Sequence, residues 1–201
     1  MLPLISTQPV GPDDQIAVVT TYQGSTSLRI HAMGFLEIAS VAARAALENK
    51  TAIDAITPSI IHCIRHAAEL YLKAIISEVK ETHRVTAQAM NKKHVMVEAD
   101  TGHHWLQRLW SEHQALIVDV LDYEAAHDEH THFDRRAWLA DFSAIIDQLH
   151  AVDPDGQSLR YPANQKGEPN LGGTMPVSLA QLERFARHAT AVFSSFAQRA
   201  C

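Results

Sequence analysis

Apolar side chains recur every three or four residues through most of the chain, and this spacing predicts five amphipathic helices. The first helix is expected from Ser27 to about Glu48, with an alanine-rich apolar face. The second is expected to begin at a cap on Thr57, with Pro58 in the first helical position, and to end near Lys80. These two predicted helices account for most of the first part of the chain.

Three further helices are predicted in the second half of the chain. The segments HHWLQRLWSEHQALIVDVLDYEAAH and THFDRRAWLADFSAIIDQLHAV carry the third and fourth, and the fourth opens on a cap-like Thr-x-x-Asp pattern at Thr131. Residues 153 to 177 contain repeated glycines and prolines and are expected to form a long loop. A capping box of Ser178 with Gln181 then opens the last helix, which should end near Arg199.

No two segments show the alternation expected of paired strands, so the predicted fold class is all-α, a bundle of about five helices. Residues 1 to about 25 are expected to be irregular or weakly extended, because prolines and glycines interrupt them and only IAVVTTY has strand character. A chain of 201 residues with 46% hydrophobic side chains fits one domain, which we expect to span residues 26–201.

The formal net charge of -6 changes the functional picture, because an acidic chain repels nucleic acid over most of its surface. Any contact with RNA or DNA must therefore be local. The two cysteines, Cys63 and Cys201, do not suggest a disulfide framework, and no stretch has the pattern of a signal peptide or a membrane span. We expect a cytoplasmic protein without membrane attachment.

The second predicted helix carries an unusual set of polar residues. At about 100° per residue, His62, His66, Glu69 and Lys73 fall in one narrow stripe with Lys80, on a helix that is apolar almost all round. The stripe is either an ordinary solvated face with a Glu69–Lys73 pair or the wall of a polar cleft. Histidines four residues apart also fit a pair of metal ligands, although the His-Glu-x-x-His motif is absent.

A second histidine cluster, HDEHTH from His127 to His132, lies close to Glu124 and has the ligand types that suit zinc or nickel. It falls at a junction between predicted helices, where polar side chains usually cap helices and solvate turns. We therefore expect no bound metal and no cofactor. Motifs for a P-loop, for Gly-x-Ser-x-Gly and for Gly-x-Gly-x-x-Gly do not occur in the sequence.

Arg108 and His113, in RLWSEH, form an Arg-x4-His pair. In RNA cleavage without a metal, the arginine would hold the phosphate and the histidine would move a proton to or from the 2′-hydroxyl or the leaving group. Five residues on one regular helix span about 140° around its axis, so both side chains reach one phosphate only if the helix is interrupted or a second subunit contributes. His113 also falls on the apolar stripe of the third predicted helix, where a buried histidine is the default.

The loop segment SLRYP places Arg160 beside Tyr161 after a DPDG turn. An arginine with a tyrosine suits the binding of an anion or stacking on a base, and it equally suits docking of the loop onto the bundle. We favour docking.

Three segments in this order, HAAELYLKAII, TGHHWLQRLW and VDPDGQSLRYP followed by a capped helix, resemble the HEPN-like helical domains of many uncharacterised bacterial proteins. The resemblance covers roughly Ser27 to Arg199. It implies a bundle built on an antiparallel pair of long helices, often dimeric, in toxin–antitoxin, phage-defence and RNA-processing proteins. Active members are metal-independent endoribonucleases with an Arg-x4-6-His motif in which a polar residue commonly follows the arginine, and here Leu109 follows Arg108.

The residues and the resemblance together suggest a cytoplasmic, homodimeric HEPN-like protein of a defence, toxin–antitoxin or stress system that binds or cleaves RNA. If it cleaves RNA, Arg108 is the expected phosphate clamp and His113 the general acid or base. The expected binding residues are His62, His66, Glu69, Lys73, His103, His104, Arg160 and Tyr161.

The alternative is a noncatalytic helical module that binds a nucleotide or another protein, such as an antitoxin. The two hypotheses differ in one structural expectation. An enzyme brings Arg108 and His113 into one cleft, whereas a module buries His113 among Leu106, Trp110 and Ile117. A metal-dependent hydrolase is the least favoured hypothesis, with ligands from His127, His130 and His132 or from His62 and His66.

Overall fold

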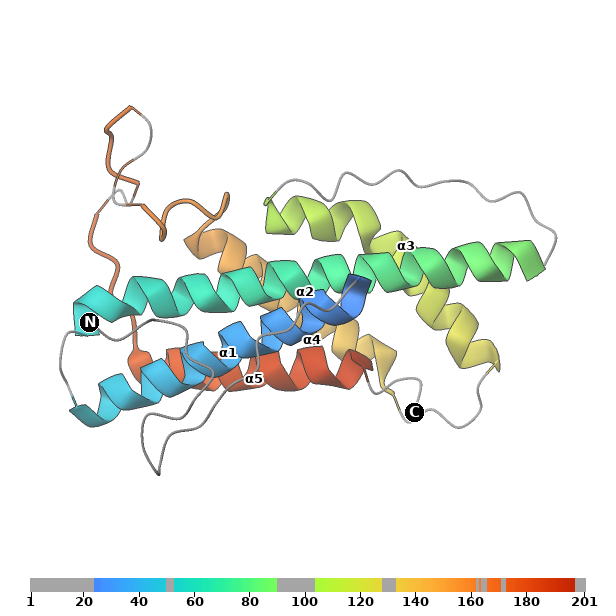
Figure 1. Ribbon diagram of the computed structural model, residues 1–201, viewed down its shortest axis with the longest axis horizontal. Coiled ribbons are helices and arrows are strands. Elements are labelled where there is room, and N and C mark those ends of the chain that lie inside the picture. Colours follow the sequence, from blue (N-terminus) through green and yellow to red (C-terminus); the bar gives the residue numbers. More distant parts are fainter. Residues whose placement is uncertain are drawn as a thin grey trace, which may run out of the picture.

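The computed structural model describes residues 24–49, 53–89, 104–127, 133–161, 163, 166–170 and 173–197. Five helices make up the regular structure of these residues, which confirms the predicted all-α bundle (Figure 1). The helices are α1 Gly24–Asn49, α2 Ile53–Ala89, α3 Leu106–His127, α4 Arg135–Val152 and α5 Leu179–Ala197.

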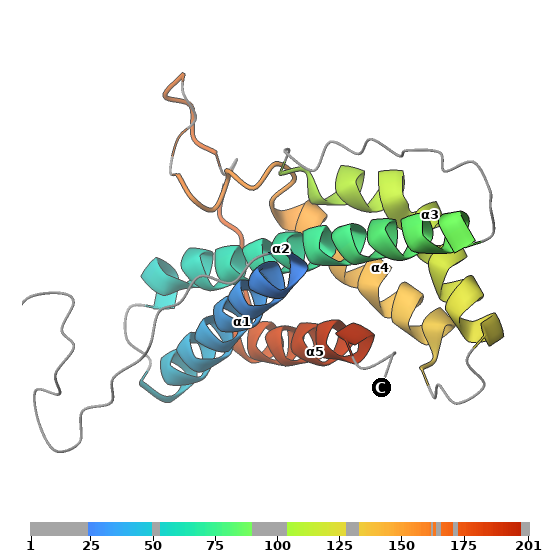
Figure 2. The same ribbon diagram turned by 45° about the vertical axis from the view of Figure 1, so that its right-hand side comes forward.

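The longest helix, α2, has 37 residues and is about 55 Å long. It packs against α1, α3 and α5, while α1 also contacts α5, and α4 contacts both α3 and α5 (Figures 1 and 2). A chain of aromatic contacts joins four of these helices through the core. Its ring centroids are 4.9 Å apart for Tyr71 and Phe193, 5.4 Å for Phe142 and Phe193, and 5.0 Å for Trp110 and Phe142. Apolar burial of this kind is the main force that holds a bundle together.

The ends of α2 differ from the prediction. The helix begins at Ile53, and Thr57 lies inside it, where its hydroxyl donates to the carbonyl of Ile53 at 2.8 Å instead of capping a helix. Pro58 is therefore the sixth residue and not the first. It is tolerated because the backbone bond it cannot make would reach the carbonyl of Asp54, in the first turn. The helix also continues beyond Lys80 to Ala89, because the segment contains no glycine or proline and Glu81 pairs with Arg84 one turn later.

The capping predictions had mixed outcomes. The side chain of Asp134, the last residue of the Thr-x-x-Asp pattern, caps α4, since it accepts hydrogen bonds from the backbone N–H groups of Arg136 and Ala137. Thr131 lies outside the described residues. Ser178 caps α5 as predicted, because its Oγ accepts from the N–H of Gln181 at 3.4 Å. The first predicted helix starts earlier than expected, at Gly24, where φ is 67°.

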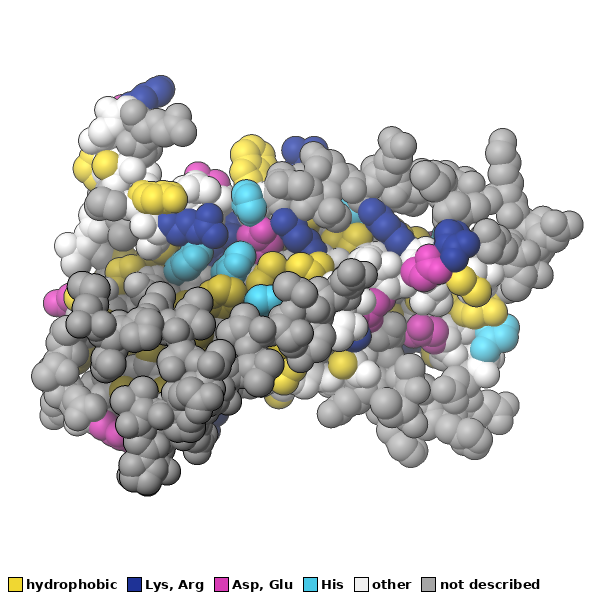
Figure 3. All heavy atoms as spheres, viewed as in Figure 1, with side chains coloured by type: hydrophobic (Ala, Val, Ile, Leu, Met, Phe, Trp, Pro, Cys, Tyr) yellow, Lys and Arg dark blue, Asp and Glu magenta, His cyan; other side chains and the backbone are white. Residues whose placement is uncertain are grey.

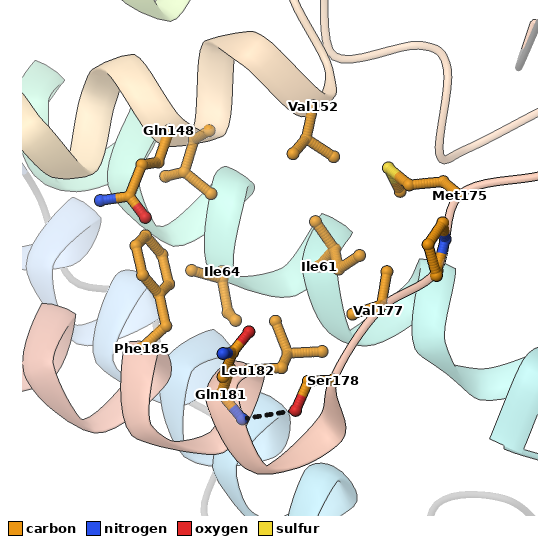
Figure 4. Close-up of a pocket in the computed structure, with 12 residues that line it drawn as sticks. Ile61, Ile64, Gln148, Val152, Met175, Val177, Ser178, Gln181, Leu182 and Phe185 are labelled. Carbon is orange, nitrogen blue, oxygen red and sulfur yellow. Dashed lines mark hydrogen bonds between the residues drawn. The ribbon is translucent and has the colours of Figure 1, made fainter.

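A cavity of about 570 Å³ lies between α2, α4, the start of α5 and residues 175–178 (Figure 4). Its walls are mostly apolar, and its polar side chains are Gln148, Ser178 and Gln181. None of the described residues that line it is titratable, and none of them is a residue that the sequence analysis selected for chemistry.

By length and composition alone, Gly24–Glu48 of α1 would be able to cross a membrane. Its apolar window has a mean hydropathy of 1.3, and 33% of that window is buried inside the protein. The exposed large hydrophobic residues of α1 are Ile30, Met33, Ile38, Val41 and Leu47.

Candidate functional site

The polar stripe predicted on α2 forms one side of a surface cluster. We use the name α2 polar face for His62, His66, Glu69 and Lys73 of α2, together with two side chains that reach them from other segments, His104 before α3 and Arg160 after α4. Figure 3 shows histidine, lysine and arginine side chains gathered over the middle of α2. The structure therefore brings six of the eight predicted binding residues together.

The α2 polar face is built on a buried arginine that the sequence analysis did not select. Arg65 is 2% exposed, and its guanidinium binds three separate segments of the chain. Its Nε donates to the carbonyl of Asp153 at 2.9 Å, one terminal nitrogen donates to the carbonyl of His104 at 2.7 Å, and the other donates to Glu69 at 3.4 Å. A buried cation is stable only when such partners replace water, so this network fixes where the loop and His104 lie on α2.

The DPDG turn predicted from the sequence fits against this arginine. Gly156 has φ of 77°, and a Cβ there would lie 2.6 Å from a terminal nitrogen of Arg65, so both the conformation and the space require glycine. Asp153 is fully buried, and its carboxylate accepts from the N–H of Ser158 at 3.1 Å. Leu159, 8% exposed, anchors the loop in the core. The loop therefore docks as predicted and delivers Arg160 to α2.

Glu69 is a buried carboxylate with three donors. Lys73 Nζ donates to it at 2.9 Å and His104 Nδ1 at 2.7 Å, in addition to Arg65. Burial has the largest single effect on the pKa of Glu69 and would raise it. The hydrogen bonds and the charges of Lys73 and His104 together outweigh burial and hold the pKa below its usual value. Because Glu69 is ionised and can only accept, His104 donates the hydrogen bond through its Nδ1 proton. The other ring nitrogen, Nε2, takes no part in this bond.

His62 and His66 are half-buried and neutral. Their rings are stacked with centroids 5.8 Å apart, and the edge of Phe35 packs on His66 at 4.7 Å. Burial lowers the pKa of both histidines, and the charge of Arg160 lowers that of His62 further. Arg160 Nε donates to His62 Nε2 at 3.3 Å, which places the proton of His62 on Nδ1. Within the described residues, the buried Nδ1 atoms of both rings have no hydrogen-bond partner.

The charges at this face favour an anion. Of the six residues of the α2 polar face, Lys73 and Arg160 are cations and Glu69 is the one carboxylate. These six residues therefore carry a net positive charge on a chain whose net charge is -6.

Two exposed aromatic side chains follow the polar groups in the chain. Tyr161, 56% exposed, comes directly after Arg160, and Asn170 holds the loop there by donating to the Tyr161 carbonyl at 2.7 Å. Trp105, 55% exposed, comes directly after His104. Aromatic rings beside cations suit the stacking of bases.

The predicted catalytic pair does not meet within the described part of the chain. Arg108 lies on the surface of α3, where its Nε donates to Glu112 at 2.7 Å and its side chain is 54% exposed. His113 is 1% exposed, and its Nδ1 donates to the carbonyl of Leu109 at 2.8 Å. It is buried on the same face as Leu106, Trp110 and Ile117, which is the arrangement expected of the noncatalytic module.

The other histidine candidates fall partly or wholly outside the described residues. His103, His130 and His132 lie outside them. His127 ends α3, where it stacks on Tyr123 with centroids 4.1 Å apart and bonds the Tyr123 carbonyl at 2.8 Å. Among the residues that the structure describes, no three histidine, cysteine or acidic side chains are grouped as a metal site.

Arg65, Asp153 and Gly156 are the site residues that the sequence analysis missed. Arg65 stands in the apolar run IRHAAEL, and an arginine on a helix that is buried all round must have carboxylate or carbonyl partners. That requirement is the signal that would have identified it. No protein-family model matches the chain, and no curated protein and no solved structure matches it.

Proposed function

We propose that this HEPN-like helical protein binds single-stranded RNA, and that the α2 polar face holds a phosphate of that RNA. The observation that carries the proposal is the convergence of Arg160, Lys73 and His104 on one face of an acidic protein, with exposed Tyr161 and Trp105 beside them. A defence, toxin–antitoxin or stress setting belongs to the same proposal and rests on the resemblance.

Each group has a role that follows from its chemistry. The two terminal nitrogens of Arg160 form a fork that matches two phosphate oxygens. Lys73 and His104 are both tied to Glu69 and lie on the same side of α2. The aromatic rings offer stacking surfaces that accept any base, so we expect weak dependence on sequence.

The positions of Arg108 and His113 on α3 favour RNA binding without cleavage by this pair. An RNA backbone would have to open α3 to reach an imidazole that is 1% exposed. Burial lowers the pKa values of the half-buried His62 and His66, so neither ring adds a positive charge near pH 7. His62 positions Arg160 instead, because its Nε2 accepts from Arg160 Nε.

The experiment that tests RNA binding is a titration of a short fluorescent single-stranded RNA, followed by anisotropy at low and moderate salt. We expect Arg160→Gln to weaken binding about tenfold, because it removes one charge-assisted contact worth about 1.5 kcal/mol, and to lower the salt dependence. The control is Arg136→Gln, an exposed arginine at the opposite end of α4. Equal affinities for Arg160→Gln and the wild type would contradict the proposal.

A second measurement separates binding from cleavage. End-labelled RNA incubated with the protein and a chelator should stay intact. Cleavage that disappears in folded Arg108→Ala and His113→Ala variants would replace the binding proposal with a metal-independent ribonuclease.

A further inference from the structure

The cavity between α2, α4, the start of α5 and residues 175–178 is separate from the α2 polar face, because none of the six residues of that face lines it (Figure 4). Its volume of about 570 Å³ falls within the roughly 300–1,000 Å³ that is usual for small-molecule sites. Protein interiors are packed closely enough that few voids exceed the size of a water molecule. This cavity is therefore large enough to hold a whole small molecule.

Three helices and one loop segment form the walls of the cavity. Ile64 of α2, Leu149 of α4 and Leu182 of α5 are at most 9% exposed, so the core holds their side chains in place. Phe185 is partly buried and offers an aromatic ring. Met175 is 39% exposed, and a methionine side chain is flexible enough to fit ligands of different shapes. The cavity therefore combines a fixed apolar wall with one adjustable side chain.

Glutamine and serine side chains supply the hydrogen-bonding groups of the cavity. Gln148 of α4 lies across the cavity from Met175 (Figure 4). Its Nε2 donates to the carbonyl of Ala144 at 3.3 Å, a bond that does not use the amide oxygen of Gln148 as an acceptor. Ser178 Oγ accepts from the backbone N–H of Gln181 at 3.4 Å, so its hydroxyl proton can be donated to a ligand. The side-chain amide of Gln181 adds a second donor and acceptor.

The lack of charge among the described lining residues decides the class of ligand. An anion or a cation would lose its water in this cavity without gaining a countercharge. A carbonyl or amide group can instead exchange its hydrogen bonds with water for bonds to the glutamine amides and the serine hydroxyl. The walls therefore favour a ligand that is uncharged and mostly apolar.

We propose that this cavity binds an uncharged, mostly apolar small molecule that carries a carbonyl or amide group. The apolar part of the ligand lies against Ile64, Leu149 and Phe185. Its polar group bonds the side-chain amide of Gln148 or Gln181. This ligand differs in charge from the phosphate proposed for the α2 polar face, so the cavity is a second site whose occupancy does not depend on RNA.

A titration of the full chain with Nile red tests whether the cavity binds a ligand. Nile red is an uncharged dye with a carbonyl group, and its fluorescence rises in apolar surroundings. Val152→Phe fills part of the cavity and should weaken dye binding at least tenfold. Val118→Phe is the matched control, because Val118 is a half-buried helical valine like Val152 but lies on α3 and does not line the cavity. No dye binding to the wild type, or equal affinities of the two variants, overturns the proposal.

Two matched competitors test the class of ligand. The molecules para-butylbenzamide and para-butylbenzoate have nearly the same shape, but only the benzoate is charged at neutral pH. We expect the amide to displace Nile red at a concentration at least tenfold lower, because the described walls offer hydrogen bonds and no countercharge. Equal displacement by the two, or stronger displacement by the benzoate, contradicts the proposed class.

A second variant keeps the proposal testable if Val152→Phe fails to fold. Gln148→Met combined with Gln181→Met changes two exposed residues, keeps their length and removes both amides from the cavity. It should raise the dissociation constant of para-butylbenzamide about three- to tenfold, which corresponds to the loss of a neutral hydrogen bond. Gln114→Met, at an exposed glutamine of α3, should bind like the wild type. If the double variant also binds like the wild type, the proposed role of the amides is wrong.

Discussion

The helices α1 and α2 pack against each other, and both are apolar around most of their circumference, yet they depart from a simple amphipathic pattern in opposite ways. α2 buries charged side chains, with Arg65 and Glu69 each 2% exposed. α1 exposes apolar ones, with Ile38 and Val41 more than half exposed. A buried charge needs partners inside the molecule, whereas exposed apolar side chains leave a surface open to contact. The two departures therefore have different physical consequences.

The largest effect is expected when the buried charge of Arg65 on α2 is removed. Arg65→Met leaves the buried Asp153 without its cation and leaves Glu69 with Lys73 and His104 as its remaining donors. We therefore expect a loss of about 3 to 5 kcal/mol in the free energy of unfolding, measured by urea denaturation. Arg108→Met is the matched control. It breaks an exposed i,i+4 pair with Glu112 and should change stability by less than about 0.5 kcal/mol. Similar losses in both variants would show that the network is not the source of stability.

A smaller effect is expected from the glycine that fits against Arg65. Gly156→Ala combines an unfavourable φ with a contact at 2.6 Å, so it should cost about 2 to 4 kcal/mol. Gly167→Ala separates the two causes, because Gly167 has φ of 80° but a Cβ there meets nothing within 4 Å. It should cost only about 1 to 2 kcal/mol, and thermal unfolding of both variants gives the difference. If Gly167→Ala costs as much, the contact with Arg65 is unimportant.

On α1 the expected change has the opposite sign. Gly34→Ala should stabilise the protein by up to about 1 kcal/mol, because alanine favours the helix and its Cβ meets nothing within 4 Å. The measurement is urea unfolding of the variant beside the wild type. An alanine variant that is less stable than the wild type would contradict this expectation.

The smallest expected effect is on the pH dependence of stability. Burial lowers the pKa of His62 and His66 below 6.5 in the folded protein, so the unfolded chain binds protons more readily as the pH falls. Their contribution is complete above pH 6.5 and is lost progressively as the pH falls through the lower folded pKa values. A His62→Gln, His66→Gln double variant should have a flatter profile of melting temperature between about pH 7.5 and 5.5. His188→Gln, an exposed control on α5, should keep the wild-type slope.

Local periodicity predicted the number and the type of the helices, because each apolar stripe is specified by residues three or four apart. It also predicted the polar stripe from His62 to Lys73, and the angle of about 140° that keeps Arg108 and His113 apart. The ends of the helices were harder to predict. The cap at Ser178 was predicted correctly, because its hydrogen bond to Gln181 is local. The cap at Thr57 was predicted wrongly, because a helix accepts a proline in its second turn when the lost hydrogen bond belongs to the first turn.

Local sequence patterns could not predict which segments of the chain meet at the site. His104 and Arg160 were selected one by one, and nothing in the spacing of either residue places it on α2. What joins them is Arg65, whose partner Asp153 is 88 residues away in the sequence. Helical periodicity carries no information over that distance. Only the requirement that a buried arginine be paired points to such a partner.

Arg65 and its partner Asp153 are far apart in the sequence and are therefore synthesised at different times. During synthesis, α2 is complete well before Asp153 has been added, 88 residues after Arg65. At about 5 to 20 residues per second, that interval lasts roughly 4 to 18 seconds. Arg160 emerges later still, so the nascent chain cannot present the complete α2 polar face until the last helix is about to be made. The proposed RNA-binding surface is therefore incomplete in chains that end before Arg160.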